Sequence, residues 1–120
     1  MYFMVKNKSN CLVFENNFLI GLDLEEMLRA RGIAAVDLSR SFVDAVERIT
    51  RSNYTAVFID LDGELEQAHQ LANLVKSNGS TAILTSTIML SQDLPAWMSE
   101  HIVLSKPFSE TQMSNILDKM

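Results

Sequence analysis

Three features are scarce in this 120-residue chain, and each scarcity excludes a class of protein. The single cysteine, Cys11, cannot form an internal disulfide, so we expect a reducing compartment such as the cytoplasm. The sequence has no cluster of Lys and Arg, and its net charge is −5, so we do not expect direct binding to nucleic acid. It also has no apolar run of membrane-spanning length and no signal peptide, so we expect a soluble protein without membrane contact.

The chain also has no internal repeat, low-complexity tract or linker, and 48% of its residues are hydrophobic. This length and composition suit one domain with a substantial core. We therefore take residues 1–120 as a single domain, in which residues 1–10 form a short N-terminal extension. Cys11 lies in an apolar segment, so its expected role is that of a small core residue.

The most informative segment is the apolar run 56–59, which ends in Asp60 and is followed closely by Asp62 and Gly63. Four apolar residues rich in β-branched and aromatic types are typical of a strand buried on both faces. A carboxylate at the end of such a strand lies where ligands bind in open α/β sheets, and it can be a metal ligand, a base or a nucleophile. The alternative is that Asp60 only caps the next helix while Asp62 and Gly63 form a turn.

Apolar segments of two periodicities alternate along the rest of the chain. Four further short apolar runs favour strands, at residues 11–14, 33–36, 81–84 and 102–104. Apolar residues spaced three or four apart indicate helices at 18–31, between Ser39 or Ser41 and Ser52, between Gly63 and Ser77, and from Ser109 to the end. We expect Ser109 and Gln112 to form a capping box. We also expect a short helix around Trp97, with Asp93 as its cap and Pro95 in its first turn.

Strands that alternate with helices predict right-handed crossovers and a parallel sheet covered on both faces. We therefore predict an α/β fold with a doubly wound, five-stranded sheet of flavodoxin-like order 2-1-3-4-5. In this order Glu15 and Asn16, after the first strand, lie beside Asp60. Thr85 and Lys106, at the ends of the fourth and fifth strands, lie at the same edge. Such oxygen ligands suit Mg²⁺, and a lysine and a hydroxyl can hold the oxygens of a phosphoryl group.

From about Cys11 onward, the chain resembles the receiver domain of response regulators in two-component signalling. Leu12-Val13-Phe14-Glu15-Asn16 resembles the family's first strand with its acidic pair, and residues 57–60 resemble the strand that ends in the phosphoacceptor. Residues 83–86 resemble the strand with the switch Thr or Ser. Residues 104–108 resemble the lysine-proline signature, in which the peptide bond is often cis.

The resemblance implies a role for each site residue and for its partners. Asp60 is the expected phosphoacceptor, Thr85 and Lys106 hold the phosphoryl oxygens, and Mg²⁺ binds to Glu15, Asn16 and Asp60. The donor is a histidine kinase or a histidine phosphotransferase. Because no output domain follows, the signal is expected to pass to a separate output protein or through a homodimer. Such a protein is the substrate of its own phosphorylation and not an enzyme with turnover.

Three residues depart from the pattern of this family. Asn16 replaces the second acid and carries no charge, which predicts weak Mg²⁺ binding. Asp62 stands two residues after the phosphoacceptor, where the family varies the side chain and so tunes the lifetime of the phosphoryl group. Val103 replaces an aromatic residue that usually turns inward on activation. Asn16 and Val103 favour an alternative, a degenerate receiver that binds a protein partner without phosphorylation, whereas the intact Asp60, Thr85 and Lys106 oppose it.

Residues 58–63 also resemble the first motif of haloacid-dehalogenase phosphatases, in which the first Asp is the nucleophile and the second a general acid and base. That motif normally opens its domain, and a Thr usually stands where this chain has Glu64. It also requires a metal-binding acidic pair downstream, where only the isolated Asp93 follows. We therefore rank this function below the two receiver hypotheses.

Overall fold

The structure is a computed structural model that describes residues 9–87 and 95–119. Within these residues the strands are β1 (Asn10–Phe14), β2 (Ala35–Ser39), β3 (Ala56–Asp60), β4 (Thr81–Ser86) and β5 (Ile102–Ser105). The helices are α2 (Phe18–Ala30), α3 (Phe42–Arg51), α4 (Leu65–Ser77), the 3₁₀ helix η1 (Ala96–Glu100) and α5 (Glu110–Asp118). Helices thus follow strands along the whole described chain, as the sequence predicts. Residues 1–8 of the expected N-terminal extension lie outside the described residues, and β1 already includes Asn10.

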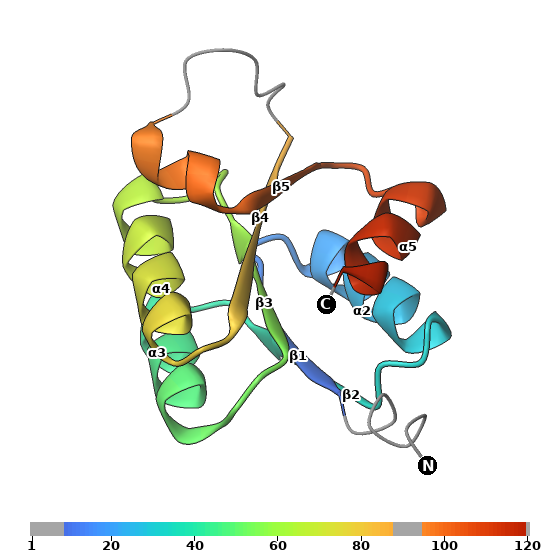
Figure 1. The fold of residues 1–120 in the computed structure, drawn as a ribbon, viewed down its shortest axis with the longest axis horizontal. Helices are drawn as coiled ribbons and strands as arrows, with labels where there is room; N and C mark the ends of the chain where they lie inside the picture. The colour runs from blue at the N-terminus through green and yellow to red at the C-terminus, as the bar shows by residue number, and fades with distance from the viewer. Residues whose placement is uncertain (1–8, 88–94, 120) are drawn as a thin grey trace.

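All strand pairs are parallel, and the sheet has the order β2-β1-β3-β4-β5. This confirms the predicted doubly wound, flavodoxin-like sheet. In Figure 1 the sheet crosses the centre of the molecule, with α3 and α4 on one side and α2 and α5 on the other. Because β1 and β3 are neighbours and the chain leaves them in opposite directions, their carboxyl ends form the switch point of the sheet.

The core consists of two clusters, one on each face of the sheet. Every residue of β3 is buried, as expected for a central strand between two helical layers. On the side of α3 and α4 the strands contribute Leu12, Phe14, Val57, Ile59, Ala82 and Leu84. On the side of α2 and α5 they contribute Cys11, Val13, Val36, Ala56, Phe58, Ile83 and Leu104. Cys11 is therefore a core residue, and burial raises the pKa of its thiol to about 12.

The second strand begins later than the sequence indicates. The apolar run 33–36 predicts it, but β2 covers Ala35–Ser39. Gly32 has a φ of +94°, and the Ile33 N–H donates to the Leu28 carbonyl, so the start of that run completes the end of α2. As a consequence Ser39 ends the strand, and Ser41 is the N-cap of α3.

The helix expected around Trp97 is the 3₁₀ helix η1, with Pro95 at its N-cap position rather than in its first turn. The predicted cap, Asp93, lies outside the described residues. The Trp97 ring stacks on His69 of α4, with 4.3 Å between the ring centroids and 12° between the planes. The predicted capping box of α5 is confirmed, because Ser109 and Gln112 each accept a hydrogen bond from the other's backbone N–H.

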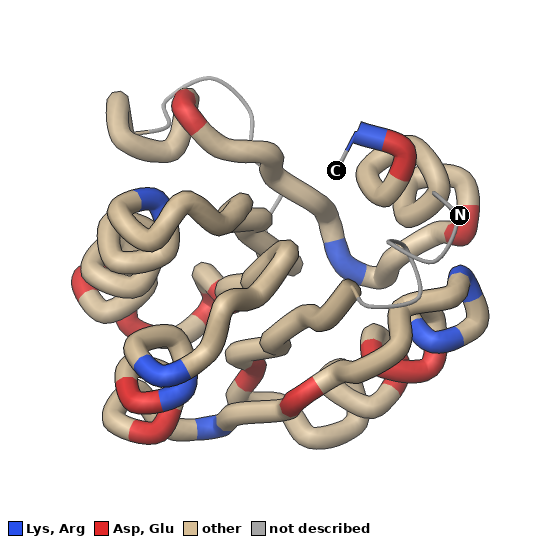
Figure 2. The backbone as a smooth tube through the Cα atoms, turned by 60° about the horizontal axis from the view of Figure 1, so that its bottom comes forward, with Lys and Arg blue, Asp and Glu red and all other residues tan. Residues whose placement is uncertain are grey.

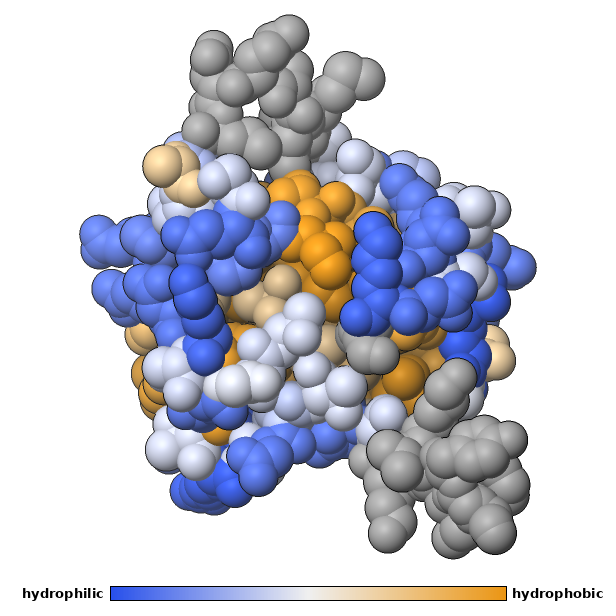
Figure 3. Space-filling view, viewed as in Figure 1, coloured by the Kyte–Doolittle hydropathy of each residue, from blue (hydrophilic) through white to orange (hydrophobic). Residues whose placement is uncertain are grey.

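The surface of the described residues carries charges of both signs and an apolar area. Basic residues are interspersed with acidic ones along the helices (Figure 2). Apolar residues reach the surface between α4 and α5, where β5 forms the edge of the sheet (Figure 3). No helix in residues 9–87 and 95–119 is long and apolar enough to cross a membrane.

Candidate functional site

The predicted site residues come together at the carboxyl edge of the sheet. Glu15 directly follows β1, Asp60 ends β3, and Lys106 directly follows β5. All three are buried, which is unusual for charged side chains unless they are paired. The peptide bond between Lys106 and Pro107 is cis, as the lysine-proline signature suggests.

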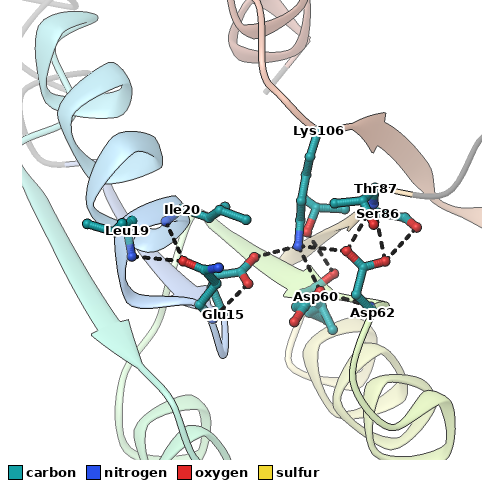
Figure 4. A network of polar contacts seen from close by, with 11 residues as sticks. Glu15, Leu19, Ile20, Asp60, Asp62, Ser86, Thr87 and Lys106 are labelled. Carbon is teal, nitrogen blue, oxygen red and sulfur yellow. Dashed lines mark hydrogen bonds and ion pairs between the residues drawn. The ribbon is translucent and has the colours of Figure 1, made fainter.

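Lys106 is the centre of the charged group. Its side chain reaches between Glu15 on one side and Asp60 and Asp62 on the other (Figure 4). The Lys106 Nζ lies 2.7 Å from Glu15 Oε1, 2.8 Å from Asp60 Oδ1 and 3.2 Å from Asp62 Oδ2. Only 3% of the lysine side chain is exposed, so its ammonium group is shielded from water and neutralises carboxylates that would otherwise repel one another.

The protonation equilibria at Lys106 and Glu15 follow from burial and pairing. Burial by itself would lower the pKa of Lys106, but its hydrogen bonds to Asp60 and Glu15 outweigh this effect and raise the pKa above its ordinary value. Burial raises the pKa of Glu15, and the hydrogen bonds that Glu15 accepts from Lys106 and from the Asn17 N–H offset this only in part. The lysine is thus held in its charged form, while Glu15 takes up a proton more readily than an ordinary glutamate.

The polar residues that follow β1 have two roles: they cap the next helix, and they contribute to the site. Asn17 is the N-cap of α2, and its Oδ1 accepts from the N–H groups of Leu19 at 3.0 Å and Ile20 at 3.2 Å. Its own N–H donates to Glu15 Oε2 at 3.0 Å, which orients the carboxylate. Asn16, between them, lies beside Gly63 in the turn after β3. β1 is therefore followed by two residues that face the site and by one cap residue.

Asp62 makes contacts that the sequence does not reveal. Its Oδ1 accepts from the Ser86 hydroxyl at 2.8 Å, and its Oδ2 accepts from the Thr87 N–H at 2.9 Å. Burial opposes the ionisation of Asp62, but hydrogen bonds from Ser86, Thr87 and Lys106 outweigh this and lower its pKa. The carboxylate is therefore a fixed negative group beside Asp60, and not only part of a turn.

Thr85 lies next to Asp60 in the register of β3 and β4. It is buried, and its hydroxyl donates to the Ile59 carbonyl over a long distance of 3.5 Å. The structure thus brings Thr85 to the site, as expected, with its hydroxyl turned toward the backbone of β3. A rotation about its Cα–Cβ bond would be needed to turn the hydroxyl away from that carbonyl.

The carboxylate and amide groups at this edge carry oxygen atoms of the kind that could hold a Mg²⁺ ion. Among the described residues no group of three His, Cys, Asp or Glu side chains is arranged to hold a metal ion. Mg²⁺, however, keeps several waters and commonly uses only one or two carboxylates. A Cβ atom built on Gly63 would lie 2.6 Å from the Asn16 amide nitrogen and 4.0 Å from Asp60 Oδ2, so the missing side chain of Gly63 leaves room for both groups. Asn16, Asp60 and Glu15 each carry an oxygen of the kind that a hydrated Mg²⁺ prefers, although the Asn16 atom nearest the Gly63 position is the amide nitrogen.

No model of a protein family matches this sequence, and no curated protein matches it. Solved structures do match it. A CheY-like receiver domain from Methylobacillus flagellatus shares 24% identity with a TM-score of 0.76, over 93% of this chain and 98% of that one. A response regulator from Thermotoga maritima shares 17% identity with a TM-score of 0.78, over 93% and 96% of the two chains.

The receiver domain of a sensor histidine kinase from Pseudomonas aeruginosa is also similar, with 22% identity and a TM-score of 0.76 over 93% of this chain and 96% of that one. It is described with a magnesium ion coordinated in its active site cleft. These structures share the five-stranded architecture that places Asp60 and Lys106 at one edge of the sheet. The chain therefore has the fold of the receiver domains of response regulators.

Proposed function

We propose that this chain is a phosphoacceptor receiver domain of a two-component phosphorelay and that Asp60 accepts the phosphoryl group. The supporting observation is the setting of Asp60, which is buried at the end of the central strand with the Lys106 ammonium 2.8 Å from its Oδ1. Its Oδ2 lies on the side of Gly63 and Asn16. One buried carboxylate thus has a cation on one side and the Asn16 amide and the Gly63 turn on the other.

The donor in this proposal is a phosphohistidine of a histidine kinase or a histidine phosphotransferase. An oxygen of Asp60 attacks the phosphorus in line, a P–O bond forms while the P–N bond breaks, and the leaving imidazole takes up a proton. Lys106 stabilises the charge on the phosphoryl oxygens, and Thr85 supplies a hydroxyl beside them after the rotation described above. Water can attack the resulting acyl phosphate, so the modification is transient and the protein acts as a stoichiometric substrate.

Glu15, Asn16 and Asp60 are the residues that would hold Mg²⁺ in this site. When bound, the ion neutralises charge on the phosphoryl oxygens. Because Glu15 and Asp60 already share the Lys106 ammonium and Asn16 carries no charge, we expect weak binding of the metal. The signal would then pass to a separate output protein or through a homodimer.

The test is mass spectrometry after incubation with Mg²⁺ and either acetyl phosphate or a histidine-phosphorylated donor protein. We expect one phosphoryl group on the wild-type chain, at Asp60, and its release by hydroxylamine, which cleaves acyl phosphates. Asp60→Asn should take up none, because the amide keeps the shape of the side chain but removes the nucleophile. Label that persists in Asp60→Asn would contradict the assignment.

A second candidate function is a degenerate receiver that binds a protein partner without phosphorylation. Two observations favour it: the uncharged Asn16, and the carboxylate of Asp62, which already binds the donors Ser86, Thr87 and Lys106. If the wild-type chain takes up no label from either donor, this function replaces the phosphoacceptor.

A further inference from the structure

The Asp62 carboxylate gathers three hydrogen-bond donors from distant parts of the chain. They are the Ser86 hydroxyl at 2.8 Å, the Thr87 N–H at 2.9 Å and the Lys106 ammonium at 3.2 Å. These partners stand 24, 25 and 44 residues further along the chain. The contacts are therefore tertiary and cannot be explained by a local turn around Gly63.

One of these donors, Lys106, also contacts the phosphoacceptor, and the other two directly follow its neighbour on β4. Lys106 also binds Asp60 Oδ1, and the Asp62 N–H donates to that oxygen at 2.8 Å. Thr85, which precedes Ser86 and Thr87, is the register partner of Asp60 on β4. A phosphoryl group on Asp60 brings three strong acceptor oxygens into this space, and charge-assisted hydrogen bonds to them would use the donors that now bind Asp62.

We propose that the Asp62 carboxylate is a built-in substitute for the phosphoryl group. It holds Ser86, Thr87 and Lys106 in the unmodified chain, and a phosphoryl group on Asp60 displaces it from these donors. The first half of this proposal, that Asp62 holds these donors in the unmodified chain, depends only on the observed contacts. The second half, the displacement by a phosphoryl group, rests on the proposed function. Asp62 is thus a positioning residue that slows phosphorylation, because each modification must first break its contacts and must overcome the repulsion between two negative groups.

The first half is tested on the unmodified protein by amide hydrogen exchange at Thr87, measured by NMR. In Asp62→Ala we expect the Thr87 N–H to exchange roughly tenfold faster or more, because it loses a charged acceptor. Asp62→Asn keeps an acceptor oxygen without the charge and should give an intermediate rate. The matched control is Glu64→Gln, which removes the same charge two residues later from a side chain that makes no cap hydrogen bond. Unchanged exchange at Thr87 in Asp62→Ala would overturn the substitute role.

The displacement is tested by the rate at which Asp60 takes up a phosphoryl group from acetyl phosphate. Asp62→Asn should be modified several-fold faster than the wild type, while Glu64→Gln should match the wild type. Equal rates for Asp62→Asn and the wild type would overturn the displacement. If only the general negative charge mattered, both variants would accelerate alike, which would also contradict it. Absence of label in every variant would refute the phosphoacceptor assignment and the displacement together, whereas the exchange rate at Thr87 would still decide the first half.

Discussion

Among single residues, Lys106 is the one on which the geometry of the site most depends. Its ammonium contacts oxygens of Glu15, Asp60 and Asp62, and the lysine side chain is almost fully buried. Taking such charges out of water is unfavourable, so a buried ion pair is weak evidence for net stability. Removal of only one partner is nevertheless strongly destabilising, because the remaining charges are left buried without compensation.

We therefore predict that Lys106→Met destabilises the protein by about 3 kcal/mol in buffer with a chelator, since three carboxylates then face one another. Methionine keeps most of the side-chain volume, so the loss reports the charge. The free carboxylates should also bind a cation better, and added Mg²⁺ should stabilise the variant more than the wild type. Urea unfolding with a chelator and with Mg²⁺ measures both effects.

The control for this variant is Lys76→Met, which removes an equal charge from an exposed ion pair with Glu100. It should change stability little and leave the response to Mg²⁺ unaltered. A Lys106→Met variant that is as stable as the wild type in chelator, and that gains no more from Mg²⁺, would show that the carboxylates do not need the lysine.

At the scale of helices and strands, the order of elements follows from the sequence because each strand contains a short apolar run and has a polar residue at its end or directly after it. The positions of Asp60 and Lys106 follow in the same way. The start of β2 does not, because apolar character alone cannot separate a residue that ends a helix from one that begins a strand. The partners of Asp62 also do not, because Ser86 and Thr87 reach it only through the register of β3 and β4.

The turn between β3 and α4 supports a prediction of its own. Gly63 does not have a positive φ, so its backbone accommodates alanine, but the new Cβ would lie 2.6 Å from the Asn16 amide. The side chain of Asn16 is flexible, and its amide group can rotate away from the new methyl group. We therefore expect Gly63→Ala to change stability by less than about 0.5 kcal/mol. The displaced amide should weaken Mg²⁺ binding several-fold. A Mg²⁺ titration followed by amide chemical shifts measures it.

The comparison variant is Gly79→Ala at the end of α4. Gly79 has a φ of +80° and open space around it, so alanine there should cost about 1 to 2 kcal/mol in backbone strain and leave Mg²⁺ binding unchanged. If Gly63→Ala binds Mg²⁺ as well as the wild type does, Asn16 is not a ligand, and the metal depends on Glu15 and Asp60.

For the whole molecule, the change of folding stability with pH depends on where the ionisable groups are buried. The apolar clusters on the two faces of the sheet contain no ionised group, whereas the carboxyl edge buries Glu15, Asp60 and Lys106. Changes of stability with mild acid therefore depend strongly on this edge. The pKa of Glu15 is raised in the folded protein and that of Asp62 is lowered, so the two groups act in opposite directions as the pH falls.

The contribution of Asp62 can be isolated as the difference in unfolding free energy between the wild type and Asp62→Asn. Because folding lowers the pKa of Asp62, its ionised form stabilises the folded state, and this contribution is fully present above the ordinary carboxyl pKa of about 4. We expect a difference of about 1 kcal/mol at pH 7, since the variant keeps an acceptor oxygen but loses the charge. It should shrink as the pH falls below about 4 and vanish below the pKa of Asp62 in the folded protein.

Urea unfolding of both proteins at several pH values between about 7 and 2 measures this difference, within the range in which carboxyl groups titrate. Glu15 is present in both chains, so its opposite effect largely cancels. The same series on Glu64→Gln shows the effect of losing a nearby charge that holds no cap hydrogen bond. A difference for Asp62→Asn that stays constant down to the lowest pH would mean that Ser86, Thr87 and Lys106 bind Asp62 whether or not it is ionised. In that case the Asp62 carboxylate could not replace a phosphoryl group as the partner of these donors, because that role depends on its negative charge.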